Sequence, residues 1–296
     1  MTETRAQWLV NRRRGIGGSD VAAIMGLSPY RTPLDVYLDK IGEGADQPDN
    51  TAMKFGRLLE PVLLDLYQQE TGQELIPVAV SYCHPQHDWM RASLDGATST
   101  RLVEIKTARS GDAWGEIGTD QVPDYYLLQV QHYMMVTGYT VADIAVLIGG
   151  SDFRIYTVYA DTDLQQLLFD KERNFWLRVL DRIPPDPINT SDLIKRYPKP
   201  LESSVEADPD LLEKIARLSV INEDIKALEL ISDNLKTDLQ MAIGAAEGIS
   251  FCGKPLVTWK AQTTNRFDQK SFQTDHQSLF DQYKTTTSTR VFRMSK

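Results

Sequence analysis

The sequence feature that most constrains this chain is a pair of short segments, Ser-Leu-Asp-Gly at 93–96 and Leu-Val-Glu-Ile-Lys at 102–106. They predict two strands joined by a turn of glycine, threonine and serine residues. Because side chains alternate along a strand, Glu104 and Lys106 share one face. Asp95 ends the partner strand, beside a glycine that lets the chain reverse. Two carboxylates and one ammonium group would therefore meet at one edge of a sheet.

This hairpin is expected to run from Trp89 to Lys106 with Ile105 in the core, and it has two interpretations. An aspartate before a glycine commonly forms a turn, and Glu-x-Lys commonly forms a solvated strand face with a weak ion pair. The alternative is that a divalent cation offsets the two carboxylates. Mg²⁺ suits such a site, because it prefers oxygen ligands and keeps open positions for water and phosphate.

Composition sets broad limits on the class of protein. The chain has 296 residues, of which 42% are hydrophobic and 25% charged, enough for one large domain or two smaller ones. No apolar run is long enough for a membrane span, the N-terminus lacks the core of a signal peptide, and we expect a cytoplasmic protein. The net charge of −9 argues mildly against a wide DNA-coating surface, although a local basic groove remains compatible with it.

The two cysteines, Cys83 and Cys252, lie far apart in the sequence and favour a reducing compartment. They cannot supply the four thiolates of a zinc ribbon or an iron–sulfur cluster. Cys83 is followed by His84 and His87, but no fourth ligand accompanies them. We therefore expect a turn there, after a strand over 74–82.

A glycine-rich segment at 15–18 follows the three arginines 12–14 and precedes a short helix that is expected from Val21 to about Met25. Ser19 has the character of its N-cap. A helix N-terminus beside arginines is suited to bind a phosphate, while a plain capped helix with solvated arginines is equally compatible. The Gly-Lys-Ser/Thr ending of a Walker loop is absent.

Three further helices are predicted in the first 140 residues. One begins after the cap Thr32 and ends at Gly42, and another runs over 51–72. In the second, Glu60 lies at the margin of the expected buried face and Pro61 is expected to bend the helix. The apolar stripe expected to form that buried face is Phe55, Leu58, Leu59, Val62, Leu63 and Leu66.

After a long loop at 107–122, the third helix is expected over 124–138, where Tyr126, Gln129 and Tyr133 share one face. They suit the orientation of a phosphate or a water, or they are ordinary partly buried polar residues. Two strands at 141–148 and 153–159 are then joined by a Gly-Gly-Ser-Asp turn.

The last part of the chain has a different pattern. An amphipathic helix over 164–180 leads into a proline-rich linker that extends to about residue 200. Near-heptad spacing of leucine and isoleucine predicts one long helix over 208–246, which would pack on another helix or on a second subunit. Strands are expected at 249–262 and 289–293. This end is locally basic and has interleaved aromatic residues, which suits contact with a nucleic-acid backbone or a small closing sheet.

Together these pieces resemble the YqaJ-like viral recombinases, which are lambda-exonuclease-type members of the PD-(D/E)xK nuclease superfamily. The similarity covers about residues 8–160 and extends more weakly to 259–263. Leu94 stands where the superfamily name has proline, which leaves the carboxylate of Asp95 in place. The matching pieces, in order, are Trp8-Leu9, the 12–19 segment, Gly56-x-x-x-Glu60-Pro61, 93–96, 104–106 and Tyr126-Leu-Leu-Gln129-Val-Gln131.

The resemblance implies a PD-(D/E)xK core at 1–198, with a mixed sheet flanked by helices, and a helical arm with a small β region at 199–296. It implies a Mg²⁺-dependent exonuclease, with Mn²⁺ as a possible substitute, that digests one strand of linear duplex DNA from its 5′ end. It further implies a homotrimer in the bacterial host cytoplasm that passes 3′ single-stranded tails to a single-strand annealing protein.

The resemblance also assigns roles to individual residues. Asp95, Glu104, Glu60 and the backbone carbonyl of Ile105 would hold the metal. Lys106 and Gln129 would complete the catalytic set. Arg12, Ser19, Tyr126 and Arg14 would bind the DNA and its terminal 5′-phosphate. Two other functions are compatible with the same fold: a structure-specific or restriction-type endonuclease, and a catalytically inactive DNA-binding protein.

Overall fold

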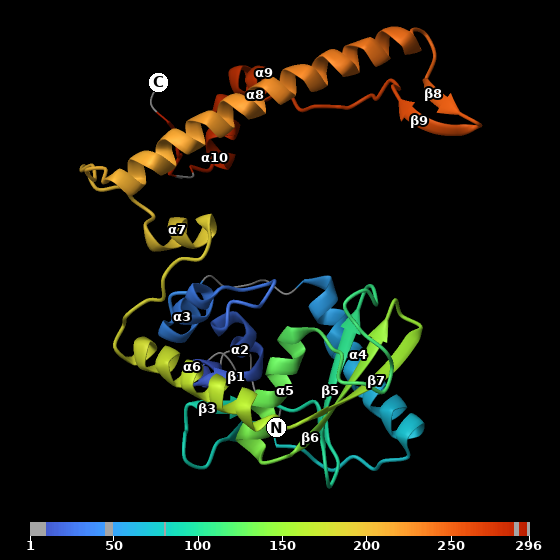
Figure 1. The fold of residues 1–296 in the computed structure, drawn as a ribbon, viewed down its shortest axis with the longest axis vertical. Coiled ribbons are helices and arrows are strands. Elements are labelled where there is room, and N and C mark those ends of the chain that lie inside the picture. The colour runs from blue at the N-terminus through green and yellow to red at the C-terminus, as the bar shows by residue number, and fades with distance from the viewer. Residues whose placement is uncertain (1–9, 45–49, 80, 287–289, 295–296) are drawn as a thin grey trace. The chain divides into compact units, whose positions relative to one another are not determined.

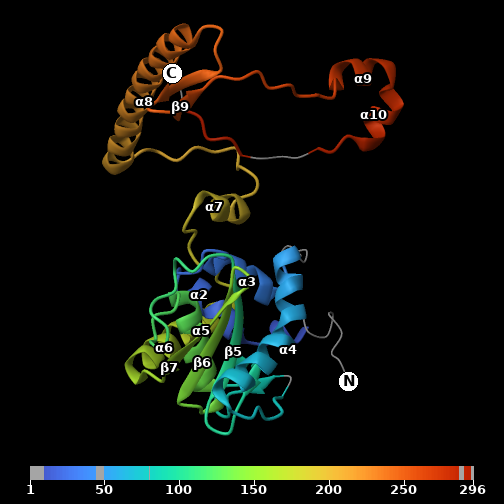
Figure 2. The ribbon, with the colours of Figure 1, turned by 90° about the vertical axis from the view of Figure 1, so that its right-hand side faces the viewer.

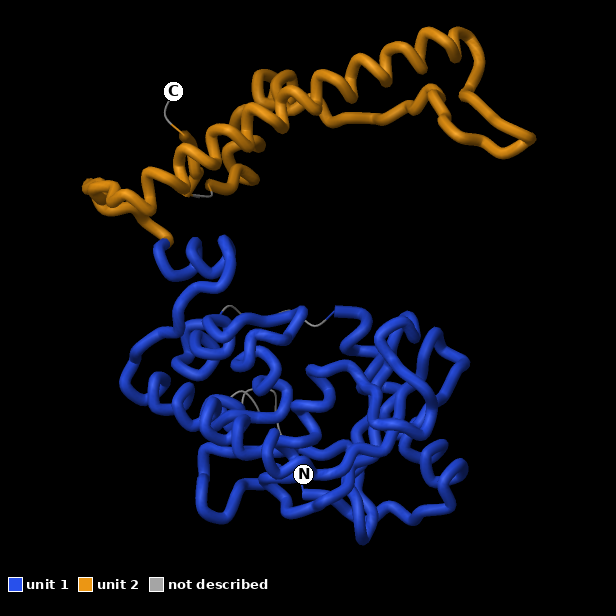
Figure 3. Tube along the Cα trace, viewed as in Figure 1, with its two compact units in different colours: residues 1–197 blue, residues 198–296 orange. Residues whose placement is uncertain are grey.

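A computed structural model describes residues 10–44, 50–79, 81–286 and 290–294 (Figure 1). The chain divides into two compact units, residues 1–197 and 198–296 (Figure 3). Trp8 and Leu9, which contribute to the family resemblance, lie outside the described residues. In the described part of the chain, none of the helices is both long and apolar enough to cross a membrane.

The first unit is built on a four-stranded sheet of order β4-β5-β6-β7, with β4 at Gly96–Ala97, β5 at Leu102–Ala108, β6 at Val141–Ile148 and β7 at Asp152–Tyr159. Strands β5 and β6 pair in parallel, and the other two pairs are antiparallel. The sheet is therefore mixed, which confirms the predicted fold class. The β6–β7 hairpin turns at Gly149 and Gly150, both at positive φ, as the two adjacent glycines predict.

The expected hairpin from Trp89 to Lys106 is wrong in its first half. Within the expected hairpin, the short strand β4 (Gly96–Ala97) pairs with β5, whereas β3 (Met90–Ala92) lies in a separate sheet between β1 (Ile16–Gly17) and β2 (Tyr82–Cys83). Because β3 pairs with the glycine-rich segment, it ties residues 16–17 to the chain just before Asp95. Of the strand expected at 74–82, the described residues keep Tyr82, the first residue of β2, and Val80 lies outside the described residues.

Two helices cover opposite faces of the sheet (Figure 2). Helix α4 (Thr51–Thr71) packs Leu63 and Tyr67 against the face that carries Val103 and Ile105. Helix α5 (Asp124–Thr137) packs against the other face, which carries Leu102, Ile144 and Val146. Strand alternation therefore directs Glu104 towards α5 and Ile105 into the core beneath α4.

The apolar stripe predicted on α4 is only partly correct. Leu63 is buried, but Phe55, Leu58 and Val62 are exposed. The caps predict the bounds of the helix, because the Asn50 side chain accepts from Met53 N and Gly72 ends the helix at positive φ. They do not predict which residues of the helix are buried. The contacts with the sheet are made by the C-terminal half of α4.

Among the described residues, the first unit also contains α2 (Gly18–Ile24), α3 (Pro33–Ile41), α6 (Thr162–Leu180) and α7 (Thr190–Arg196). A second hydrophobic cluster joins α2, α3, α5 and α6 through side chains that include Val21, Val36, Leu128 and Leu168. The start and end of α3 are confirmed, since Thr32 caps it and Gly42 ends it at φ 82°. The linker expected at 184–200 is wrong where α7 forms. This helix is joined to the start of α3, because Asp192 accepts from Thr32 Oγ1 at 2.8 Å.

The second unit contains α8 (Pro209–Ile243), the hairpin strands β8 (Gly248–Phe251) and β9 (Lys254–Thr258), and the short helices α9 (Gln269–Asp275) and α10 (Gln277–Tyr283). The long helix is confirmed within three residues at each end. The strand expected at 289–293 is wrong over 290–293, where the chain has no regular structure, and Thr289 lies outside the described residues.

Candidate active site

The site begins at the end of β5, where Asp95 is fixed against the strand. Asp95 Oδ2 accepts from Ile105 N at 2.8 Å. The N–H of Ile105 therefore points away from β6 and towards Asp95. Because the N–H and C=O of one strand residue point to the same side, the Ile105 carbonyl lies on that side too, beyond the end of β4. An aspartate and a main-chain oxygen are thus directed to the same open edge.

Glu104 is the centre of the site and is only 2% exposed. Its Oε1 accepts from Gln129 Nε2 at 2.6 Å and forms an ion pair with Lys106 Nζ. Its other oxygen, Oε2, is buried and has no hydrogen-bond partner in the part of the chain that the structure describes. A buried carboxylate oxygen without a donor is costly, so this atom is available to an additional partner.

The acids at this edge influence one another. Burial, followed by the charge of Asp95, raises the pKa of Glu104 to about 8. Burial also raises the pKa of Asp95, against the lowering effect of Lys106 and the Ile105 N–H. The pKa of Glu60 on α4 is raised by burial and by Asp95. These three carboxyls carry more negative charge than Lys106 balances.

Lys106 stays cationic in this setting. Burial lowers the pKa of its ammonium group, but the charges of Glu104 and Asp95 outweigh burial and raise it. Its Nζ lies 4.9 Å from the centre of the Tyr126 ring, a cation–π contact. Trp114, from the loop after β5, packs against the Tyr126 ring, and the two ring centroids are 5.7 Å apart.

The predicted polar face of α5 is directed at this acid site. Gln129 Nε2 donates to Glu104 Oε1 and also lies 3.0 Å from the Tyr133 hydroxyl. Tyr126 lies one turn earlier, against Lys106. The sequence therefore predicts correctly that these three side chains share a face, and the structure shows which group each of them touches.

A hard, oxygen-rich donor set with an unpartnered carboxylate oxygen fits the chemistry of Mg²⁺. The acids do not form a closed ligand cage, because no group of three or more His, Cys, Asp or Glu among the described residues is arranged to hold a metal ion. At the segment Cys83, His84 and His87 the predicted turn is confirmed, since the His87 N–H donates to His84 O at 3.3 Å. The fit to Mg²⁺ thus rests on donor chemistry and on Glu104 Oε2.

The glycine-rich segment reaches the same helix α5. A Cβ built on Gly18 would lie 2.4 Å from Tyr133 Cε1, so only glycine permits this approach of α2. Ser19 is exposed and is not the N-cap. Gly17 is the N-cap, and its N–H donates to Asp20 Oδ2 at 3.2 Å. The segment therefore lies two side chains, Tyr133 and Gln129, away from Glu104.

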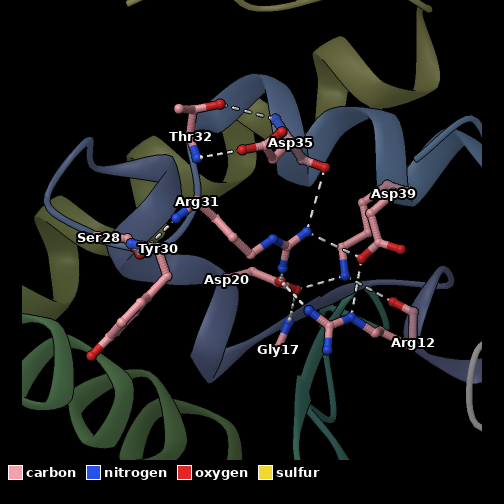
Figure 4. A network of polar contacts seen from close by, with 10 residues as sticks. Arg12, Gly17, Asp20, Ser28, Tyr30, Arg31, Thr32, Asp35 and Asp39 are labelled. Atoms are coloured by element: carbon pink, nitrogen blue, oxygen red, sulfur yellow. Dashed lines mark hydrogen bonds and ion pairs between the residues drawn. The ribbon is translucent and has the colours of Figure 1, made fainter. Parts of the chain in front are cut away.

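Arg12 belongs to a polar network around the buried Asp20 (Figure 4). Arg12 Nη2 lies 3.0 Å from Asp20 Oδ1, and its Nε lies 3.0 Å from Asp39 Oδ2. Arg31 Nη1 and Lys40 Nζ also contact Asp20, at 2.8 and 2.6 Å. The charges of these cations lower the pKa of Asp20 far below its usual range, although burial acts in the opposite direction.

Sequence reasoning missed four members of this network: Asp20, Arg31, Asp39 and Lys40. The available signal was Asp20 in the first turn of α2, where a carboxylate favours the helix N-terminus. Of the other predicted phosphate ligands, Arg14 is exposed at the surface. The structure thus brings Asp95, Glu104, Lys106, Gln129 and Tyr126 together, places Glu60 within their electrostatic influence, and holds Arg12 in a separate network.

The fold and site define a mixed α/β protein with a buried acid–lysine cluster at the end of a central strand. The chain belongs to the YqaJ-like viral recombinase family, whose domain model matches residues 7–140. It is 30% identical over 301 residues to the uncharacterized protein YqaJ of Bacillus subtilis strain 168, covering 98% of this chain and 93% of that protein.

Two solved structures are also similar. One is an alkaline exonuclease, LHK-Exo, from Laribacter hongkongensis, with 22% identity and a TM-score of 0.49, covering 64% of this chain and 96% of the other. The second is a putative exonuclease from Eubacterium rectale, with 14% identity and a TM-score of 0.47, covering 70% of this chain and 97% of the other. The resemblance to the YqaJ-like family drawn from the sequence is confirmed by the family match.

Proposed function

We propose that this protein is a Mg²⁺-dependent exonuclease, with Mn²⁺ as a substitute, that digests one strand of linear duplex DNA in the 5′-to-3′ direction. The observation that carries the proposal is the buried Glu104, with one oxygen anchored by Lys106 and Gln129 and the other without a donor. Membership of a viral recombinase family supports a role in DNA recombination, for which the products would be 3′ single-stranded tails.

The metal would be held by Asp95, Glu104, Glu60 and the carbonyl of Ile105, directly or through water. When bound, it supplies a water of lowered pKa and stabilises charge on the phosphate. Burial, followed by the charge of Asp95, raises the pKa of Glu104, and a cation would offset both by favouring the ionised carboxylate.

The protein side chains contribute position and charge. Lys106, held between Glu104 and the ring of Tyr126, directs a positive charge to the phosphate group where negative charge develops. Gln129 is fixed by Glu104 and Tyr133, so its amide is pre-oriented to position the phosphate or the water.

Arg12, Ser19 and Arg14 are proposed to bind the terminal 5′-phosphate, which would explain a requirement for a DNA end. Three cations and two carboxylates give the Arg12 network a surplus of one positive charge. This surplus favours an anion at its surface. The remaining proposals carried by the family resemblance are a homotrimer, a single-strand annealing protein as partner, and action in the cytoplasm of a bacterial host.

The test uses a linear duplex with a 5′-phosphate, incubated with Mg²⁺, with Mn²⁺ or with EDTA. We expect digestion only with a metal ion, and we expect end-labelled strands to show that the 5′-terminated strand is removed. A covalently closed plasmid should stay intact, since an end is required. Cleavage of the closed plasmid would instead indicate an endonuclease, and DNA binding without cleavage under any metal condition would indicate an inactive DNA-binding protein.

Lys106→Ala is expected to lower the cleavage rate by about 100-fold or more, because it removes a preorganised charge from the reacting phosphate. Duplex binding, measured by fluorescence anisotropy in EDTA, should change little. The matched control is Lys171→Ala on the exposed side of α6, which should keep the parent rate. Equal turnover by Lys106→Ala and the parent would remove Lys106 from the site.

A further inference from the structure

The C-terminal end of the chain has the opposite charge from the remainder. Residues 248–296 contain eight Lys or Arg and three Asp or Glu, a net charge of +5 in a chain whose net charge is −9. All Lys and Arg side chains of the described part of this segment are exposed. A basic segment on an acidic protein is the electrostatic signature of contact with a polyanion.

The hairpin β8–β9 places most of its large side chains on one face. Residues opposite one another in an antiparallel pair share a face, and the pairs Ile249↔Val257 and Phe251↔Lys254 lie on the same side. Trp259 continues this face, because its N–H donates to Glu247 O at 2.8 Å, one step beyond the last pair. The opposite face carries the small residues Gly248, Ser250, Pro255 and Thr258.

This large-residue face is open. Phe251 is 70% exposed and Trp259 is 49% exposed, and Lys254 and Lys260 adjoin them. A two-stranded hairpin is only marginally stable alone in water, and its two aromatic rings are exposed, so they do not form a core that stabilises it. Exposed aromatic rings of this kind mark a binding surface. Cys252 and Gly253, both at positive φ, form the tight turn that keeps the two strands in register.

The combination of rings and cations favours a single-stranded nucleic acid over a protein. Apolar side chains alone would be enough to bind a protein partner. Residues 248–296 instead combine eight Lys or Arg with seven aromatic residues in 49 positions. In a duplex the faces of the bases are stacked on one another. In a single strand these faces are free to stack on exposed rings, while the phosphates meet the lysines.

We propose that the β8–β9 hairpin binds single-stranded DNA, with Phe251 and Trp259 stacking on bases and Lys254 and Lys260 meeting phosphates. The biological source of that strand rests on the proposed function, since a 5′-to-3′ exonuclease produces 3′ single-stranded tails. The binding itself does not require cleavage. Lys260 already pairs with Glu247 at 2.7 Å, so Lys254 is the more informative lysine to change.

The test measures the full-length protein with a fluorescent oligothymidylate of about 20 nucleotides in EDTA, where a metal-dependent nuclease does not act. The double variant Phe251→Ala/Trp259→Ala is expected to bind at least about 10-fold more weakly, since base–aromatic stacking contributes strongly to such complexes. The matched control, Ser250→Ala/Thr258→Ala, changes the opposite face of the same hairpin and should bind as the parent does.

Two further variants separate stacking and charge from simple misfolding. Trp259→Phe keeps a ring and should bind within about 3-fold of the parent. Lys254→Gln should reduce the slope of log affinity against log salt by about 0.7, the value for one phosphate contact on a single strand. Circular dichroism of each variant checks that the hairpin change leaves the helices intact.

Parent-like binding by the double variant overturns the proposal, and so does failure of the parent protein to bind the oligonucleotide. A change in oligomeric state on sedimentation, with oligonucleotide affinity unchanged, also overturns it and identifies the face as a protein interface. Cleavage of a linear duplex is measured separately, so the loss of one activity without the other shows whether the exonuclease or the strand-binding proposal has failed.

Discussion

Two buried carboxylates in the first unit are stabilised in opposite ways. Asp20 is 1% exposed and Glu104 is 2% exposed. Asp20 contacts Arg12, Arg31 and Lys40, and it also accepts from the Gly17 N–H. Glu104 has one cation, Lys106, two carboxyls nearby and one oxygen without a donor. The pKa of Asp20 is lowered and the pKa of Glu104 is raised, although burial acts on both in the same direction.

The difference shows what each cluster does for the protein. A buried carboxylate with an excess of cations is a structural centre, and here it ties the residue-12 segment to α2 and α3 (Figure 4). A buried carboxylate with too few cations is costly in the folded protein alone and is favourable once a cation arrives. The two sites are joined through α2, which carries Asp20 and touches Tyr133 at Gly18.

The largest stability effect is expected for Asp20→Asn. Lys40 Nζ is fully buried and contacts Asp20 Oδ2 and the carbonyl of Arg12. Removing the negative charge leaves a buried ammonium group without its counter-ion, which costs about 3–5 kcal/mol. Urea unfolding should show this loss as a lower midpoint with an unchanged slope.

The control for this change is Asp39→Asn. Asp39 also contacts Arg12 and Arg31, but its side chain is 19% exposed, so water compensates part of the loss. We expect a cost of about 1 kcal/mol, the scale of one hydrogen bond. Equal effects of the two substitutions would contradict the view that Asp20 is the centre of the network.

Gly18→Ala is expected to have an intermediate effect and to reach both sites. The new Cβ would lie 2.4 Å from Tyr133 Cε1, so the ring must shift, and overpacking of this kind costs about 1–3 kcal/mol. Because Tyr133 contacts Gln129, which donates to Glu104, the shift should also slow cleavage. The measurements are thermal unfolding and the digestion rate of a linear duplex.

Gly56→Ala provides a matched comparison within helix α4. Outside the backbone of its own helix and its chain neighbours, no atom lies within 4 Å of the position of its added Cβ, and alanine is the better helix former. Its stability should therefore rise by about 0.5–1 kcal/mol. If both alanine variants stabilise the protein, the close approach of α2 to Tyr133 does not restrict residue 18.

The parts of the site that follow from local pattern could be predicted from the sequence. Alternation along β5 separates Glu104 and Lys106 from Ile105, and helical spacing places Tyr126, Gln129 and Tyr133 on one face. Both depend only on neighbours along the chain. The caps of α3 and the glycine turn of β6–β7 are predictable for the same reason.

What could not be predicted depends on pairing between distant segments. The contact of Lys40 with Asp20 joins residues 20 positions apart on different helices, and no spacing rule connects them. The exposure of Phe55 on α4 depends on where that helix meets the sheet. Residue type favours Ser19 as the cap, but the Gly17 N–H donates to Asp20, one position later, whose carboxylate is held by cations.

The last expected effect is a pH dependence that has opposite signs at the two carboxylates. In metal-free protein, burial and Asp95 raise the pKa of Glu104 from 4.5 to about 8, so the folded form keeps a proton that the unfolded chain has lost. This contribution is fully present below pH 4.5 and is lost as the pH rises towards 8. Between pH 6 and 7 the loss is about 1.4 kcal/mol, the value of one pKa unit. Asp20 has a lowered pKa, so its contribution is present above about pH 4 and is lost only in acid.

Unfolding in EDTA at pH 6, 7 and 8 checks the sign for Glu104. Glu104→Gln cannot ionise, so its stability should vary less with pH than that of the parent and should exceed it at pH 8. Mg²⁺ should stabilise the parent at pH 8 and leave the variant unchanged, because the ion replaces the missing positive charge only where the carboxylate is present. A parent protein equally stable at pH 6 and 8 in EDTA would mean that Glu104 is compensated as fully as Asp20. The contrast between an ion-binding and a structural carboxylate would then fail.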